Sequence, residues 1–404
     1  MIGKIPLAWY QLKREKMRLL IALLGIAFAN MLMFVQLGFQ DALLDSAVKF
    51  HKSVNGDIFL ISPNSTALVS LKSFPLRNLY QTLSFEGVES VNAIYMGLGL
   101  WKNPDNKIEG KFDNFTAARS IFIIGFNPSE SVFNMPEVND KLDVIKQQDI
   151  VLFDQDSRGE FGSIAKWYNQ GKTVVTEIDD RQVTVGGLFR LGPTFGANGN
   201  VITSDVNFLR LFKRRKKSSI EIGVIKVYPG ADIDYLVSEM SKFFGVEKTE
   251  KGAIYHQGIK VLSKAGFIDF ERSYWQKNTN IGFIFSLGTM MGFVVGIIIV
   301  YQILYTDVSD HLPEYATLKA MGYTDFYLLT VVFQESVILA ILGYIPGGLI
   351  ANMMYNLTKN ATNLPIGMTE QRAILVLVLT FIMCFVSGAI AVRKLSAADP
   401  ADIF

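Results

Sequence analysis

The stretch IGFIFSLGTMMGFVVGIIIVYQILY, residues 281–305, runs for 25 positions without a charged side chain. A helix needs about 20 apolar residues to cross about 30 Å of hydrocarbon, so this stretch predicts a membrane-spanning helix. Half of the 404 residues are hydrophobic and 19% are charged, a balance that also favours a membrane protein. Four apolar runs predict four spans: residues 19–39, 281–305, 327–354 and 373–392.

The first run has a second interpretation, a cleaved signal peptide, because basic residues precede it and Ala27-Phe28-Ala29 resembles a cleavage site. Apolar residues continue for ten positions beyond that point, which favours a membrane anchor. The basic cluster before the run predicts that residues 1–18 are cytoplasmic, by the positive-inside rule. Four spans return residues 393–404 to the same side, so both termini are expected to be cytoplasmic.

The segment between the first two predicted spans has the alternation of a globular domain. Runs of branched and aromatic residues predict strands at residues 56–62, 90–101, 120–126, 149–154, 181–189 and 220–227. Two amphipathic stretches that end on glycine predict helices at residues 75–87 and 231–245. We therefore expect a two-part α+β extracytoplasmic domain at residues 56–266, with strand–helix–strand units near both ends and a β-rich lobe at about residues 127–218.

Two predicted stalk helices join this domain to the membrane, at residues 40–55 and 267–280. Apolar side chains continue at helical spacing in both segments, although a loop with chance periodicity is the alternative. The remaining connections are a cytoplasmic coupling loop at residues 306–326 and a short periplasmic loop at residues 355–372.

No catalytic motif is found in the sequence: it has no GxSxG, HExxH, CxxC or kinase signature. Gly171-Lys172-Thr173 suggests a nucleotide-binding loop, but such a loop needs a glycine where Lys166 stands. The single cysteine, Cys384, excludes a disulfide within the chain. We expect a protein that is not an enzyme and binds no cofactor of its own.

Small residues repeat every four positions in the second predicted span, at Gly288, Gly292 and Gly296. Glycines at this spacing share one helix face and let another helix approach closely. We predict a packing seam between two copies of the chain, and packing within one subunit is the alternative.

One acid, Glu335, lies about two turns into the third predicted span. A buried carboxylate is costly there unless it is paired or near the interface. It could relay protons or bind an ion, but the favoured interpretation is a helix anchor that reaches headgroups or a basic partner. Later in this span, GYIPGG at residues 343–348 predicts a kink or break.

The densest charge run is KRRKK, formed by Lys213, Arg214, Arg215, Lys216 and Lys217. Such a run attracts anionic lipid or an acidic partner such as an adaptor protein, and a solvated loop is the plainer interpretation. A location outside the cell argues against nucleic acid.

The loop DHLPEYATLKAMGYTD, residues 310–325, has residue types that commonly begin and end a short helix. Pro313 and Glu314 suit its first turn, Lys319 its last turn, and Gly322 the position just after it. Tyr315, Leu318 and either Met321 or Gly322 share one face. That face suits docking onto a soluble partner that has a motor, or burial in the lipid headgroups.

The segment EYATLKAMGYTDFYLLTVVFQESVILAILGYIPG resembles the signature of FtsX-like permeases, the MacB-type (type VII) ABC transporter family. The whole chain resembles the DevC branch from cyanobacteria, including PLAWYQLKREKMRLLIALLGIAFA, QLGFQDAL and DVSDHLPEYATLKAMGY. Pro313 departs from the broader family, where a charged residue is common before the acid, but fits the DevC branch.

The resemblance implies a homodimeric inner-membrane permease that works with a separate ABC ATPase, which binds the ATP and Mg. It implies that residues 56–266 form a periplasmic domain with a membrane-proximal part and an inserted β-rich lobe. It also implies a periplasmic adaptor, a TolC-like outer-membrane channel, and mechanical transmission that exports a glycolipid or another envelope component. Other branches regulate cell-wall hydrolases, so a signalling scaffold is the alternative. The residues implied to couple to the ATPase are Glu314, Tyr315, Leu318, Lys319, Met321 and Gly322.

Overall fold

The computed structural model describes residues 16–105, 118–194, 196–245, 258–311, 313–314, 317, 321, 325–362 and 364–396. The chain divides into two compact units. One unit, which we call the helix bundle, comprises Met1–Ala42 and Thr279–Phe404. The other, the globular domain, is Leu43–Asn278.

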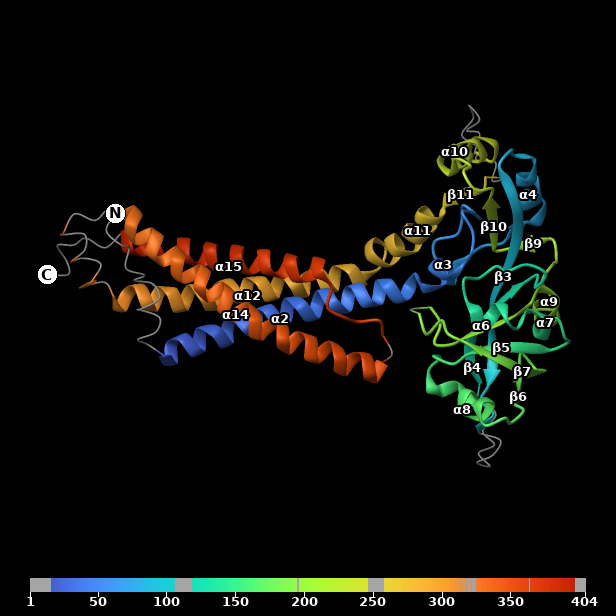
Figure 1. The fold of residues 1–404 in the computed structure, drawn as a ribbon, viewed down its shortest axis with the longest axis horizontal. Helices are drawn as coiled ribbons and strands as arrows, with labels where there is room; N and C mark the ends of the chain where they lie inside the picture. Colours follow the sequence, from blue (N-terminus) through green and yellow to red (C-terminus); the bar gives the residue numbers. More distant parts are fainter. Residues whose placement is uncertain are drawn as a thin grey trace. The chain divides into compact units, whose positions relative to one another are not determined.

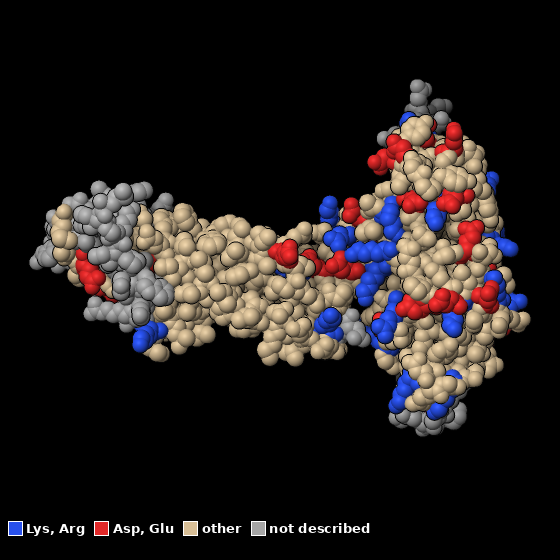
Figure 2. Space-filling model, viewed as in Figure 1, with Lys and Arg blue, Asp and Glu red and all other residues tan. Residues whose placement is uncertain are grey.

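The helix bundle consists of α2 (Lys16–Ala47), α12 (Asn280–Asp310), α14 (Asp325–Thr362) and α15 (Glu370–Ser396), which lie side by side in Figure 1. By length and composition, four segments can cross a membrane: Lys16–Ala47, Asn280–Asp310, Thr330–Ala361 and Glu370–Ala391. Figure 2 shows that most of the visible surface of these helices carries no charged side chain. Such a surface suits contact with hydrocarbon.

The middle of α14 packs closely on α2. A Cβ atom on Gly343 would lie 2.5 Å from Ile26, and one on Gly347 would lie 2.8 Å from the Ala27 carbonyl oxygen, so only glycine fits at both positions. The helix continues through Pro346 without the predicted break. Neighbouring helices commonly compensate for proline in membrane helices, which accounts for the difference.

The globular domain is built on a nine-stranded sheet in the order β11-β1-β10-β3-β4-β8-β5-β7-β6. Its strands, with the small β2–β9 pair, are β1 (Ile58–Ile61), β2 (Phe74–Pro75), β3 (Val88–Lys102), β4 (Ala118–Phe126), β5 (Ile150–Asp154), β6 (Val175–Ile178), β7 (Arg181–Phe189), β8 (Asn200–Ser204), β9 (Ser219–Ile220), β10 (Ile222–Val227) and β11 (Lys260–Ser263).

The 15-residue strand β3 divides this sheet into two parts. Its first half pairs with β10, and its second half pairs with β4. The far strand β6 returns to β3 at the pair Trp101↔Ile178. The strands from β3 through β4, β8, β5 and β7 to β6 therefore close into a small barrel, to which β3 and β4 contribute although they precede the predicted lobe at residues 127–218.

Short helices cover both parts of the sheet (Figure 1). The described helices of the domain are α3 (Lys49–Ser53), η1 (Leu68–Ser70), α4 (Leu76–Gln81), η2 (Thr82–Ser84), α6 (Pro136–Asn139), α7 (Leu142–Ile145), η3 (Gly159–Phe161), α8 (Ile164–Asn169), α9 (Asp205–Leu211), α10 (Ile233–Phe243) and α11 (Lys264–Lys277). The structure thus confirms the predicted fold class, four membrane helices with a large domain of helices and strands between the first and second.

Candidate functional site

Charged side chains gather where α12 ends and α2 begins. Asp307, in the last turn of α12, is 4% exposed, and its Oδ1 lies 3.6 Å from Nη1 of Arg18 on α2. The other terminal nitrogen of Arg18 donates to Asp310. Opposite charges in a partly buried setting attract strongly, so these contacts join the first helix to the end of the second.

The third helix contributes Glu335 to the same place. Its side chain is completely buried in α14, and its carboxyl interacts electrostatically with that of Asp307. It therefore points into the bundle, which differs from the predicted anchor at the headgroups. We call Arg18, Asp307, Asp310 and Glu335 the Arg18 cluster; its members are one cation and three acids.

Contacts of His311 fix the C-terminal end of α12. The backbone N–H of His311 donates to the Asp307 carbonyl oxygen at 3.1 Å, and the His311 ring nitrogen Nδ1 lies 3.0 Å from the same oxygen. His311 is only 6% exposed. The last turn of α12 is therefore capped by the first residue after it.

The coupling loop that follows contains a helical turn. The Thr317 hydroxyl donates to the Pro313 carbonyl oxygen at 2.8 Å, and the Met321 N–H donates to the Thr317 carbonyl oxygen at 3.0 Å. Glu314 and Met321 are both exposed, the latter by 64%. The other predicted coupling residues lie outside the described residues: Tyr315, Leu318, Lys319 and Gly322.

The opposite end of the bundle holds a second ion pair, which we call the Arg372 cluster. Arg372 of α15 is 5% exposed, and its Nη2 and Nε lie 2.7 and 3.2 Å from Oδ2 of Asp41 on α2. Its Nη1 donates to the Gly367 carbonyl oxygen at 2.7 Å. The guanidinium carbon lies 5.5 Å from the centre of the Tyr355 ring, whose hydroxyl donates to the Phe34 carbonyl oxygen.

The glycine repeat of α12 packs within one chain, which differs from the predicted seam between two chains. A Cβ on Gly288 would lie 2.5 Å from Gln36 of α2, and Gly292 contacts the same helix. Gly296 approaches Met383 of α15. The sequence pattern identified the packed face of α12 but could not identify the helix that packs on it.

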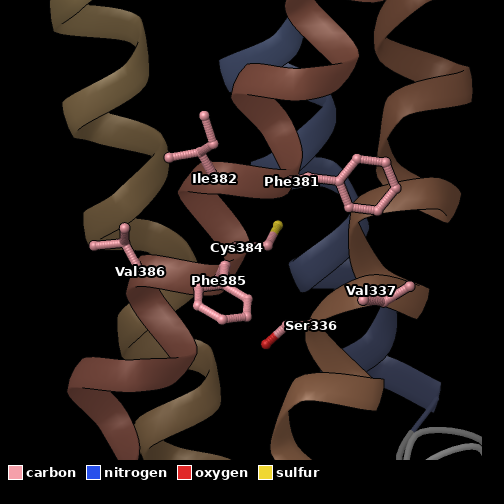
Figure 3. A pocket seen from close by; sticks show the side chains of 7 residues that line it. All are labelled: Ser336, Val337, Phe381, Ile382, Cys384, Phe385 and Val386. Atoms are coloured by element: carbon pink, nitrogen blue, oxygen red, sulfur yellow. The ribbon is translucent and has the colours of Figure 1, made fainter.

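Two helices of the bundle leave a small apolar pocket (Figure 3). Its volume is about 230 Å³, and its lining contains almost no polar surface. α14 and α15 provide its walls, which are formed by Ser336, Val337, Phe381, Ile382, Cys384, Phe385 and Val386. A pocket of this kind suits hydrocarbon and offers no path for a polar solute.

Part of the basic run is structural. Arg215 donates at 2.6 Å to Oε1 of Glu221 and at 2.8 Å to the Met96 carbonyl oxygen. Glu221 is 2% exposed, and burial raises the pKa of its carboxyl. The other four residues of the run are exposed and remain candidates for a lipid or adaptor contact.

A buried polar pair joins α3 to α11 inside the globular domain. Nε2 of His51 lies 3.6 Å from Oε2 of Glu271, which accepts from the Leu68 N–H, while Oε1 accepts from the Trp275 indole, both at 2.7 Å. Burial, together with the charge of Lys264, lowers the pKa of His51 to about 3. Burial raises the pKa of Glu271 to about 7. Both side chains are therefore held mainly neutral at pH 6.

The family comparison matches residues 285–400 to the FtsX-like permease C-terminal family. Over these residues, the chain is similar to the C-terminal domain of FtsX-like permeases. The matched region includes most of α12, the coupling loop, α14 and α15, and so includes every member of the Arg18 cluster except Arg18. No curated protein matches the sequence.

Two solved structures are similar to the chain. The crystal structure of the periplasmic region of MacB from Actinobacillus actinomycetemcomitans is 11% identical with a TM-score of 0.32, over 53% of this chain and 91% of that one. The extracellular domain of the noncanonic ABC-type transporter YknZ from Gram-positive bacteria is 12% identical with a TM-score of 0.32, over 52% of this chain and 100% of that one.

Proposed function

We propose that this chain is the permease subunit of an ATP-driven exporter of the MacB type. The supporting observation is that the FtsX-like match contains a loop that begins as a helical turn directly beyond the Arg18 cluster. A partner that binds this loop would act on a point where α2, α12 and α14 are joined. The residues proposed to bind it are Glu314, Tyr315, Leu318, Lys319, Met321 and Gly322.

The bundle would act by movement of its helices, and no cargo would pass between them. Two buried hydroxyls in the bundle bond to neighbouring helices: Thr380 donates to Asn30 at 2.6 Å, and Ser387 donates to the Ile297 carbonyl oxygen at 2.9 Å. α2 is one helix from the Arg18 cluster to Ala47, past the end of its apolar run. Since a helix transmits displacement along its axis, α2 is suited to carry motion towards the globular domain.

The partners follow from the MacB type. A separate ABC ATPase would supply ATP and Mg, and a periplasmic adaptor would connect the globular domain to a TolC-like outer-membrane channel. Both termini would lie in the cytoplasm, because Lys16 and Arg18 begin α2. The cargo class proposed for a DevC-like permease is a glycolipid or another envelope component.

We propose a homodimer that uses the exposed face of α12. Large apolar side chains follow one stripe of this helix, opposite its glycines: Phe283, Leu287, Met290, Val294 and Ile298. In a background without Cys384, a Leu287→Cys variant should cross-link to its copy in membranes. A Leu375→Cys variant on α15, equally exposed, serves as the control, and equal cross-linking of both variants would argue against this seam.

The coupling claim is tested with Leu318→Arg in proteoliposomes that contain the ATPase. A charge on the docking face should abolish the stimulation of ATP hydrolysis by the chain while insertion into the membrane is preserved. Lys359→Glu, an exposed change in the last turn of α14, should leave hydrolysis unchanged. Normal stimulation in Leu318→Arg would contradict the proposal. Coupling without movement of any cargo would favour an FtsX-like signalling scaffold.

A further inference from the structure

A groove runs along one face of α11 in the globular domain. Its volume is about 420 Å³, within the range of small-molecule sites. The α11 side chains that line it recur every three or four residues and so share one helix face: Gly266, Asp269, Phe270, Ser273, Tyr274 and Lys277. Lys260 and Leu262 of β11 and Ser65 and Thr66 of the preceding loop form the remaining wall.

The groove has fixed walls, because the adjoining face of α11 is anchored in the domain core. Phe267 is fully buried, and its ring stacks on Phe59 with 4.4 Å between centroids. The carboxyl group of Glu271 accepts from the Leu68 N–H and holds the loop that carries Ser65 and Thr66. The Ser65 hydroxyl in turn accepts from the Lys72 N–H at 2.9 Å.

The chemistry of the groove is apolar in its floor and cationic at its rim. Leu262, Phe270 and Tyr274 are half-buried. The ammonium of Lys260 lies 4.5 Å from the centre of the Phe270 ring, and Lys277 supplies a second exposed cation against the single acid Asp269. Amphipathic lysines of this kind bury their stems and offer their charge to an anion. The groove therefore complements a molecule with an apolar part and a negative headgroup.

One end of the groove is close to a membrane-spanning helix along the chain. Lys277 precedes Asn280, the first residue of α12, by three positions, so their Cα atoms lie within about 11 Å of each other. Tyr274 and Trp275 come just before, and aromatic residues of this type concentrate at the membrane–water interface. Lipid headgroups are thus the nearest abundant source of a negatively charged amphiphile.

We propose that this groove binds the headgroup and upper acyl chain of an anionic membrane amphiphile. The site goes beyond the proposed export function, because binding requires neither the ATPase nor a second chain. Lys260 and Lys277 contact the negative headgroup, and the Phe270 and Tyr274 rings contact the acyl chain.

The test uses site-specific photo-cross-linking of the full-length chain alone in nanodiscs. Benzoylphenylalanine replaces Ser273 inside the groove, and radiolabelled phosphatidylglycerol or phosphatidylcholine is present at equal mole fraction. We expect at least fivefold more label on the protein with phosphatidylglycerol. The preference should disappear in Lys260→Gln/Lys277→Gln and persist in Lys166→Gln/Lys226→Gln, which removes two exposed lysines elsewhere in the domain.

Two further arms separate the groove from its surroundings. Benzoylphenylalanine at Gln276, exposed on the same helix but outside the groove, should show no headgroup preference. Excess glycerol phosphate should not compete, because it lacks the acyl chain. Equal labelling by the two lipids, insensitivity to the groove lysines, full competition by glycerol phosphate, or a chain-to-chain product at Ser273 would each overturn the proposal. Thermal unfolding of each variant checks that the fold is retained.

Discussion

The two ends of the helix bundle bury charge in opposite ways. In the Arg372 cluster, one guanidinium meets one carboxylate, a backbone carbonyl and an aromatic ring, so its donors are well used. In the Arg18 cluster, one guanidinium meets Asp307 and Asp310, and Glu335 adds a third acid from α14. The first arrangement suits a rigid clamp. The second has more acids than cations, and under the proposed function a partner at the loop would act on it.

The largest expected effect is loss of the clamp. Arg372→Gln should lower the free energy of unfolding by about 2 kcal/mol, because the half-exposed Asp41 loses two donors to its Oδ2 and the Gly367 carbonyl loses a charged donor. A thiol-reactive dye measures this well, since the buried Cys384 is the only cysteine. An unchanged melting temperature would mean that this end of the bundle is not a clamp.

Glu271, a buried acid of the globular domain, can be compared with the charged groups of the two clusters. The pKa of Glu271 is raised to about 7, so the folded state binds a proton that the unfolded state releases above pH 4.5, and stability from this group falls as the pH rises from 4.5 to 7. Replacement by glutamine removes this loss. The stability of Glu271→Gln relative to wild type should therefore rise by about 2 kcal/mol between pH 5 and pH 8.

Urea unfolding monitored by tryptophan fluorescence can follow that change, because Trp101, Trp167 and Trp275 all lie in the globular domain. Because the pKa of His51 is lowered, the contribution of this residue to folding stability is lost as the pH falls from 6.5 towards 3. The loss is the same in the variant and in the wild type. A constant difference between variant and wild type across the pH range would show that Glu271 is not held neutral by burial.

Arg18→Gln should have a smaller effect on stability and a larger effect on coupling. The Arg18 and Asp310 side chains are 27% and 51% exposed, so the loss of stability should be about 1 kcal/mol. Stimulation of the ATPase should fall at least fivefold, because α2 is no longer tied to the end of α12. Arg372→Gln is the matched control: it should lose stability more than coupling. If Arg18→Gln lost more stability and Arg372→Gln lost more ATPase stimulation, the two clusters would not differ in the way described.

The smallest effect is expected at Glu335. Glu335→Gln removes the ionisable group beside Asp307 and should change the free energy of unfolding by less than about 1 kcal/mol. If excess acid makes the Arg18 cluster responsive, the same variant should also lower ATPase stimulation about twofold. A larger loss of stability in this variant would show that Glu335 is a structural anchor after all.

The sequence was sufficient for the fold class, because long uncharged runs and alternating strands are local signals. It missed the short strands β6, β8 and β11, although β1 and β5, which are equally short, were predicted. It also placed the β-rich lobe too narrowly, since β3 serves both parts of the sheet and only pairing partners reveal this.

The site was predictable only in part, for a physical reason. Arg18 belongs to the basic cluster that predicts a cytoplasmic N-terminal segment, yet it contacts Asp310, 292 positions away, and no local pattern predicts such a pair. Gly288, Gly292 and Gly296 identified a packed face without the helix that packs on it. The presence of an acid at Glu335 suggested a special position, but its complete burial beside Asp307 depends on how the helices pack.

The most direct test of the central claim is to purify the tagged chain from mild detergent and identify the bound proteins by mass spectrometry. The account predicts that an ABC ATPase is recovered with the wild-type chain and with Lys359→Glu, and is lost with Leu318→Arg. A chain recovered without any ATPase, or an ATPase retained by Leu318→Arg, would contradict a motor that docks on the loop between α12 and α14.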